Sequence, residues 1–335
     1  MKKSILPVGK LPLDLLGTFL KDLEPDDPNV IVGPGIGEDA CVIRFGDQHL
    51  VFKTDPITFA TESIAWYLVT INANDIACMG GIPKYLLVTF LLPEGATTPD
   101  SATQLFSDLK KACASSGIAL VGGHTEITYG ITRPIAAGFM IGVLPRNEVI
   151  RASGARPGDV ILMSKSIPIE ATGILAREKP DKIDADEDTL LRATRLIYDP
   201  GISIVKEARI ALEAGGVTAM HDPTEGGIAT GLLEIALACG CGIEVHLEKI
   251  SILDIAREIL PRFEIDPLGA LASGSLLVCC KPESAGWILT SWERESIPGA
   301  AIGRITEKQS LILYRDGVAT DLPSFTADEI TKAFS

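Results

Sequence analysis

Apolar positions recur at helical spacing in some segments and alternate in others, and one helical segment stands out in the first half. Over residues 62–80 an apolar stripe also carries Asp75, with Asn72 one turn earlier. The pattern predicts a core helix that ends at the glycine pair 80–81. Since an ionised carboxylate on a buried stripe is costly unless it is paired, hydrogen-bonded or metal-bound, we expect a partner for Asp75.

Shorter patterns flank this helix. Residues 40–45 and 49–54 predict a β-hairpin, and Pro56 is expected to end the second strand, which would place Asp55 at the edge of a sheet rather than within it. Strands packed against long helices indicate an α+β layer pair that is complete near residue 150. The other elements predicted here are strands over residues 84–92, 118–121 and 134–144 and helices over residues 12–23 and 99–116.

The composition changes beyond residue 146, where a loop-like stretch of Ala, Ser, Gly and Pro begins. We therefore predict two domains, residues 1–150 and 151–335, both of the α+β class. In the second domain, strands are predicted over residues 160–164, 217–220, 243–247, 274–280, 301–305 and 311–314, and helices over residues 170–178, 188–197, 204–214, 254–260 and 282–292, with a further long helix that ends at residue 239.

Charge and cysteine usage narrow the possible partners. Asp and Glu number 44 against 30 Lys and Arg, a formal net charge of −14. This balance argues against binding to nucleic acid or to an anionic membrane, whereas phosphate ligands stay compatible because amides and bound cations supply positive charge. No stretch approaches the about 20 apolar residues of a membrane span. The 7 cysteines show no zinc spacing, so we expect a reduced, cytoplasmic protein.

The motif DPTEGG at residues 222–227 has two compatible interpretations. Asp222 would be the N-cap of a helix, with Pro at the first helical position and Glu225 closing a capping box. The start of that helix would also present free amides to an anion, and Gly226 and Gly227 would let a phosphate or a partner chain approach closely.

Two other glycine-rich segments carry polar side chains. GPGIG at residues 33–37 lacks the features of a dinucleotide or Walker loop, and it predicts a turn or a flexible arm. The arm would bring Asp39 to a site as a hard oxygen ligand of the kind that Mg²⁺ prefers beside a phosphate. VGGHTE at residues 121–126 is expected to end a strand, with His124 and Glu126 as either structural or site residues. A hydrolase triad has little support, because neither its residue order nor a nucleophile elbow is present.

Five motifs in this order resemble the aminoimidazole ribonucleotide (AIR) synthetase, or PurM-like, superfamily. They are GEDA at residues 37–40, TD at 54–55, NDIACMGGIP at 74–83, GGHTE at 122–126 and DPTEGG at 222–227. The superfamily includes thiamine-monophosphate kinase, selenophosphate synthetase and the hydrogenase maturation protein HypE. The likeness is greatest to HypE-like, AIR synthase-related proteins.

This resemblance implies a fold, a cofactor and a set of site residues. The N-terminal domain would pair with its twin in a homodimer to form a β-barrel, and the C-terminal domain would be α+β. ATP and Mg²⁺ would bind in a cleft, with the metal held by Asp39, Asp55 and Asp75. Asp55, Asp75, His124 and Asp222 would be catalytic, and the cofactor-binding positions would be Gly35, Gly37, Asn72, Asn74, Gly123, Glu126, Gly226 and Gly227.

The sequence departs from HypE at its tail and in its charges. HypE acts on a cysteine at the end of a Pro-Arg-Ile-Cys-like tail, whereas this sequence ends in TKAFS at residues 331–335. His221 and Glu225 replace two arginines of HypE, and His124 replaces an acidic residue. Selenophosphate synthetase needs an N-terminal Cys or selenocysteine with a nearby Lys in a Gly-rich arm, and the first Cys here is Cys41.

Two functional hypotheses follow. The first is a homodimeric, Mg²⁺-dependent enzyme that transfers a phosphate of ATP to an oxygen of an unidentified acceptor, either a small molecule or a group of a partner. A carboxylate and metal cluster suits this chemistry, which depends on positioning and charge neutralisation. The second is a HypE-like maturation or scaffold protein that binds nucleotide and a protein partner. A metal-dependent phosphohydrolase fits the residue types but not the order of the motifs.

Overall fold

The computed structural model describes residues 6, 9–21, 23 and 25–334. Within this range the chain forms two compact units. The first unit comprises residues 26–33 and 39–149. The second unit comprises residues 150–334, residues 34–38 and the described residues among 1–25. None of the helices in the described range is long and apolar enough to cross a membrane.

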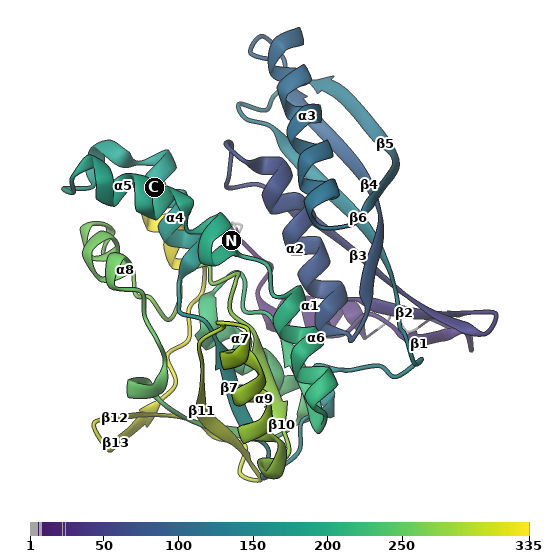
Figure 1. Cartoon of the computed structure of the whole chain (residues 1–335), viewed down its shortest axis with the longest axis vertical. Coiled ribbons are helices and arrows are strands. Elements are labelled where there is room, and N and C mark those ends of the chain that lie inside the picture. The colour runs from purple at the N-terminus through teal and green to yellow at the C-terminus, as the bar shows by residue number, and fades with distance from the viewer. Residues whose placement is uncertain (1–5, 7–8, 22, 24, 335) are drawn as a thin grey trace, which may run out of the picture. The chain divides into compact units, whose positions relative to one another are not determined.

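The first unit is a mixed sheet covered by two helices. Its elements are β1 (Val30–Val32), β2 (Cys41–Phe45), β3 (Gln48–Ile57), α2 (Ile64–Cys78), β4 (Ile82–Pro93), α3 (Pro99–Ser115), β5 (Ala119–Thr128) and β6 (Ile135–Val143). The strand order is β1-β2-β3-β6-β4-β5, in which only the β4–β5 pair is parallel. α2 packs on β3 and β6 and also contacts α3 (Figure 1).

The second unit contains the other sheet, in the order β13-β12-β9-β11-β7-β10-β8. α7 packs its apolar side chains, Leu232 and Ile235 among them, into a core with Ile161 and Val245 of the sheet. The strands are β7 (Val160–Ser164), β8 (Val217–His221), β9 (Gly242–His246), β10 (Leu277–Cys280), β11 (Gly299–Thr306), β12 (Leu311–Arg315) and β13 (Val318–Asp321). The helices are α1 (Leu13–Leu20), α4 (Ile169–Glu178), α5 (Glu187–Arg195), α6 (Val205–Ala214), α7 (Gly227–Cys239), α8 (Asp254–Ile259) and α9 (Pro282–Arg294).

Short helical turns complete the second unit. They are η1 (Ala152–Gly154), η2 (Pro180–Lys182), η3 (Ile197–Gly201), η4 (Leu247–Lys249), η5 (Leu260–Phe263) and η6 (Glu329–Ala333). Both sheets mix parallel and antiparallel strands, since β4 and β5 are parallel in the first sheet and β9 and β12 are parallel in the second. The α+β class and the two-unit architecture are confirmed.

The predicted core helix is confirmed as α2, and Asp75 within it is buried. The apolar surface is wider than one stripe, because every residue of α2 except Trp66 is buried. A helix that is buried on all sides must satisfy its polar side chains within the protein. α2 therefore brings Asn72, Asn74 and Asp75 into the interior of the first unit.

The expectation that β3 ends at Asp55, at a sheet edge, is wrong. β3 continues to Ile57, and Asp55 and Pro56 pair with Gly138 and Ala137 of β6. β2 pairs with β3 only as far as Phe52, so the end of β3 has a neighbouring strand on one side only. Pairing with β6 continues on both sides of Pro56, and proline adopts an extended backbone without strain, so Pro56 does not end β3.

Two further expectations for the motifs are wrong. β5 does not end at Val121 but runs through the glycine pair to Thr128, so His124 and Glu126 lie within a strand. Gly123 has φ of +152°, and a Cβ there would lie 1.9 Å from the backbone oxygen of Val88, so this position needs glycine where β5 approaches β4. α7 starts at Gly227 with Gly226 as a left-handed N-cap, so Asp222 is not the N-cap.

Candidate functional site

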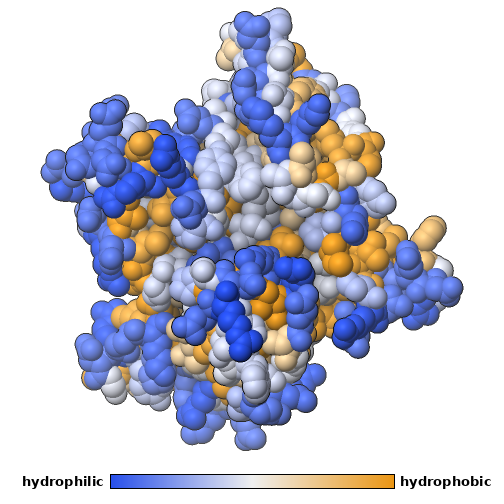
Figure 2. All heavy atoms as spheres, in the orientation of Figure 1, coloured by the Kyte–Doolittle hydropathy of each residue, from blue (hydrophilic) through white to orange (hydrophobic). Residues whose placement is uncertain are grey.

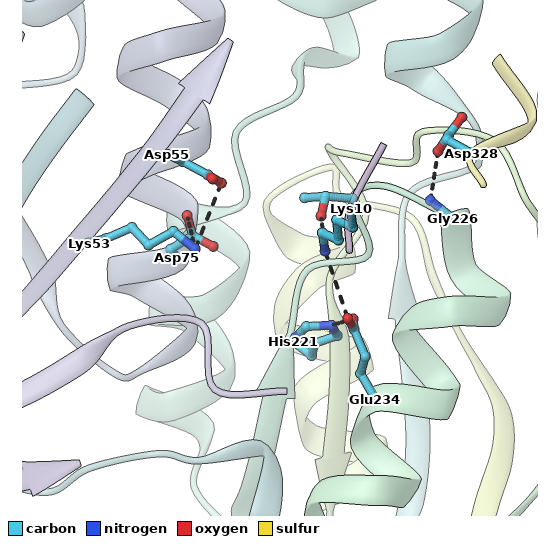
Figure 3. Close-up of polar contacts among 9 residues, drawn as sticks. Lys10, Lys53, Asp55, Asp75, His221, Gly226, Glu234 and Asp328 are labelled. Carbon is cyan, nitrogen blue, oxygen red and sulfur yellow. Dashed lines mark hydrogen bonds and ion pairs between the residues drawn. The ribbon is translucent and has the colours of Figure 1, made fainter. Parts of the chain in front are cut away.

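Lys53 joins two of the predicted carboxylates in the first unit. Its Nζ lies 3.4 Å from Oδ2 of Asp75 and 3.7 Å from Oδ2 of Asp55 (Figure 3). Lys53 and Asp55 are two residues apart on β3, so their side chains leave the same face of the strand, whereas Asp75 comes from α2. The ammonium group reduces the cost of burying Asp75. The structure thus brings Asp55 and Asp75 to one cation.

Asn72 contacts the backbone of Asp55. Its Oδ1 accepts a hydrogen bond from the Asp55 N–H at 3.0 Å, and its Nδ2 donates to the carbonyl oxygens of Asp55 at 3.3 Å and of Leu68 at 2.9 Å. The side chain is fully buried. All of these partners are protein groups, so a role of Asn72 in cofactor binding stays a prediction.

Asp39 and Asn74, the other predicted polar ligands of the first unit, are also buried. The Asp39 carboxylate lies within 4.8 Å of the Cys78 thiol at the end of α2. In the described part of the chain, the carboxylates of Asp39, Asp55 and Asp75 do not all lie within 4.8 Å of one another. Their joint use as metal ligands therefore stays a prediction.

His124 and Glu126 are neighbours on the exposed surface of β5. His124 Nε2 lies 3.3 Å from Glu126 Oε2, and the Thr128 hydroxyl donates to Glu126 Oε1 at 2.9 Å. The Thr128 hydrogen bond, followed by the contact with His124, lowers the pKa of Glu126. The pair is available to solvent, and its part in catalysis or cofactor binding stays a prediction.

In the second unit, the amides at the start of α7 already have partners. Gly226 N–H donates to Oδ2 of Asp328 at 2.6 Å (Figure 3), and Gly227 N–H donates to the Thr224 carbonyl at 3.0 Å. These two amides are therefore not free, and binding of an anion at the start of the helix stays a prediction. Asp222, in the loop before them, is buried. Roles of Asp222, Gly226 and Gly227 in catalysis or cofactor binding stay predictions.

Asp328 fixes this loop from the C-terminal segment. Its Oδ1 accepts from Ile330 N–H at 2.8 Å and from Leu271 N–H at 3.4 Å, while Oδ2 accepts from Gly226. Burial raises the pKa of Asp328 to about 6, although these three N–H donors oppose the shift. Sequence analysis did not identify Asp328, because its partners lie 57 and 102 residues away.

A buried polar contact beside the same motif was also missed. His221 Nε2 lies 2.9 Å from Oε2 of Glu234 on α7, and both side chains are buried. Lys10 reaches the group from the N-terminal segment, with Nζ 3.8 Å from Glu234 Oε1 and 3.3 Å from the Thr224 hydroxyl (Figure 3). The one available signal was that Glu234, a charged residue, falls in the apolar pattern of α7.

The arm of residues 34–38 packs on α7. Gly37 has φ of +76°, and a Cβ there would lie 2.9 Å from the Glu234 carbonyl oxygen. At Gly35 a Cβ would lie 3.2 Å from the Glu38 side chain. Gly37 is thus required by backbone conformation and by close packing, and cofactor binding by Gly35 and Gly37 stays a prediction.

Glu170 at the start of α4 is a third buried carboxyl that the sequence did not reveal. Burial raises its pKa to about 8, and the carboxylates of Asp328, Glu225 and Asp222 add to the increase, while the Ser273 hydroxyl opposes it. Its Oε2 has no hydrogen-bond partner among the described residues. Glu170 is therefore mostly protonated at neutral pH, and this part of the second unit concentrates acidic groups.

Comparison with known proteins identifies two domain matches in succession. Residues 37–144 match the N-terminal domain of AIR synthase related protein, and residues 156–316 match its C-terminal domain. Together they span nearly all of the region between Gly37 and Asp316.

Individual relatives are similar over most of their length. A Methanocaldococcus jannaschii protein named for hydrogenase expression and formation is 29% identical over 287 residues, which cover 83% of this chain and 82% of the relative. Carbamoyl dehydratase HypE of Escherichia coli is 25% identical over 283 residues, which cover 82% and 81%. A crystal structure of HypE in complex with ATP has a TM-score of 0.72 at 23% identity, covers 90% of each chain and shows the same fold.

Proposed function

Because the chain belongs to the AIR synthase-related protein family, we propose that it is a Mg²⁺-dependent enzyme that transfers a phosphate of ATP to an oxygen of an acceptor. The approach of Asp55, Asp75 and Lys53 in the first unit is the observation that best supports this function. ATP-dependent chemistry of this kind needs little covalent participation by the protein and depends on holding charged groups in place. The acceptor is unidentified.

The donor atoms suit the proposed cofactors. Carboxylate oxygens are the hard ligands that Mg²⁺ takes in phosphate sites, and Asp39, Asp55 and Asp75 would provide them. The bound ion would neutralise phosphate charge. Lys53 already contributes one positive charge between Asp55 and Asp75, so it limits their mutual repulsion before any ligand binds. Asn74, His124, Glu126 and Asp222 would orient the nucleotide or the acceptor.

We also propose that the first unit forms the homodimer. Along β5 the side chains of Val121 and Ile127 are 54% and 58% exposed, and Tyr129 just beyond is 85% exposed. Figure 2 shows hydrophobic side chains gathered where Figure 1 places β5. An exposed apolar edge strand is a template for pairing with another chain, and a twin sheet would cover it, as in the barrel implied by the family resemblance.

A second candidate function is that of a maturation protein that binds nucleotide and a protein partner without the tail-cysteine chemistry of HypE. The name of the Methanocaldococcus jannaschii relative, which refers to hydrogenase expression and formation, favours it. A cytoplasmic location is part of both proposals.

Turnover separates the two candidates. ADP formation is measured with Mg²⁺, ATP and the small-molecule fraction of a host extract, for the wild type and for Asp75→Asn. The enzyme proposal predicts ADP formation that requires both Mg²⁺ and the extract and that is lost in the variant. Absence of extract-stimulated turnover, together with a stable protein partner in pull-downs from the host, would contradict it and favour the maturation protein.

A further inference from the structure

The side chain of Asn72 bonds to the backbone of Asp55 in the way that a neighbouring strand would. Beyond Phe52, β3 pairs with β6 and not with β2. The N–H and C=O of Asp55 on the open side of β3 both bond to the Asn72 amide, at 3.0 Å and 3.3 Å. A carboxamide offers one acceptor and two donors in one plane, so it reproduces the reciprocal bonds of a neighbouring strand.

The strand opposite leaves room for this amide. Asp55 pairs with Gly138 of β6, and a Cβ at position 138 would lie 2.5 Å from Asn72 Nδ2 and 2.9 Å from its Cγ. Real Cβ atoms do not approach that closely, so any larger residue at this position would displace the Asn72 side chain. Gly138 and Asn72 therefore act as a matched pair.

α2 holds β3 at two neighbouring points. Asn72 and Asp75 are three residues apart on one face of the helix; the first bonds to the Asp55 backbone and the second contacts Lys53. We propose that Asn72 is a positioning residue, which fixes the backbone of Asp55 so that its carboxylate stays close to Lys53 and Asp75, and that it does not itself contact nucleotide or metal. The inference rests on the proposed role of Asp55 in cation binding.

Hydrogen–deuterium exchange at the Asp55 amide tests the contact in the ligand-free protein. In Asn72→Ala this amide is expected to exchange at least tenfold faster than in the wild type, because its acceptor is removed. Thr70→Val, which changes another buried polar side chain of α2, serves as the control and should leave the Asp55 amide unchanged. Equal exchange in Asn72→Ala and the wild type would overturn the proposal.

The Mg²⁺ dependence of binding of a non-hydrolysable ATP analogue tests the positioning role. Introduced alone, Asn72→Ala should raise the half-saturating Mg²⁺ concentration about tenfold. Added to Asp55→Asn, it should leave the half-saturating Mg²⁺ concentration of that variant unchanged. An equal rise in the half-saturating Mg²⁺ concentration with and without Asp55→Asn would show that Asn72 contacts the ligand directly. A lower Tm with unchanged Mg²⁺ dependence would show a purely structural role. Either result would overturn the proposal. A wild type that does not bind the analogue would refute the proposed function, while Asp55 exchange would still decide whether Asn72 holds the strand.

Gly138→Ala provides an independent variant. It should displace the Asn72 amide and so reproduce both the faster Asp55 exchange and the raised Mg²⁺ requirement. In Asn72→Ala/Gly138→Ala the clash is relieved, so Tm should recover relative to Gly138→Ala while the Mg²⁺ requirement stays raised. Unchanged Asp55 exchange in a folded Gly138→Ala protein would contradict the matched pair.

Discussion

Lys53 places a positive charge within 4 Å of two carboxylates, one of which is buried. Removal of one partner from a buried ion pair leaves a charge without compensation, which costs more than the pair contributes. The side chain of Lys53 is partly exposed, so solvent screens part of this cost. Lys53 is thus expected to stabilise the ligand-free protein and to share Asp55 and Asp75 with a bound cation.

Lys53→Met should lower the free energy of unfolding by about 1–3 kcal/mol, because Asp75 loses its ammonium partner. Urea unfolding measures the loss, and saturating Mg²⁺ should restore part of it. In Lys53→Met/Asp75→Asn the loss should be smaller than the sum of the two single losses. Wild-type stability of Lys53→Met would show that this ion pair does not stabilise the fold.

Glu170 predicts a stability that depends on pH. Its pKa is about 8 in the folded protein, against an ordinary value of 4.5, so the folded state binds more protons than the unfolded state between these values. The contribution of Glu170 to stability is complete below pH 4.5 and is lost as the pH rises towards 8, at up to about 1.4 kcal/mol per pH unit. Asp328, with a pKa of about 6, acts in the same direction below that pH.

Glu170→Gln should remove the part of this slope above pH 6.5, where Asp328 is largely ionised in both states. Urea midpoints of the wild type and the variant between pH 6.5 and 8 measure the difference. Asp328→Asn is the matched control, since it should flatten the profile only at lower pH. Parallel profiles of Glu170→Gln and the wild type above pH 6.5 would contradict the buried, protonated state of Glu170.

At the scale of elements, β5 differs from the other long strands of its sheet. Its residues are exposed along nearly the whole strand, whereas buried positions alternate with partly buried or exposed ones along most of β4 and β6. β5 is also at the end of the strand order, and among the described strands β4 is its one neighbour. A long, partly apolar edge strand of this kind is expected to be covered in solution.

Val121→Lys should therefore convert a dimer into a monomer, because it would bury a charge in the proposed interface. Sedimentation equilibrium measures the change in mass. Val318→Lys on β13 of the second unit is a control with similar exposure, and it should leave the dimer intact. A monomeric wild type, or a variant that stays dimeric, would contradict a dimer formed through β5.

For the molecule as a whole, the sequence predicts the α+β class, most helices and the buried carboxylate of α2. These follow from local patterns that the fold preserves, such as the apolar run around Asp75. The wrong predictions concern residues whose local preference is overridden by a neighbouring element. Pro56 does not end β3 because pairing with β6 continues on both sides of it, and the glycine pair before His124 continues a strand because β4 approaches it closely.

The residues that sequence analysis missed have partners far away in the chain. Glu234 is the partner of both Lys10 and His221, and Asp328 is the partner of Gly226; each of these contacts joins separate elements. No spacing rule connects such positions, because only the fold brings them together. Asp222 was misassigned as a cap because α7 starts five residues later, at Gly227, with a left-handed glycine before it.

Nucleotide binding through the carboxylates of the first unit is tested most directly by thermal stability. Tm is measured with Mg²⁺ and a non-hydrolysable ATP analogue for the wild type, Asp75→Asn and the charge-matched control Glu94→Gln. A ligand at about 100 times its dissociation constant adds about 2.7 kcal/mol of stability. We predict a rise in Tm that requires Mg²⁺, that occurs in the wild type and Glu94→Gln, and that is lost in Asp75→Asn. No rise in the folded wild type, or an equal rise in Asp75→Asn, would contradict nucleotide binding through the carboxylates of the first unit.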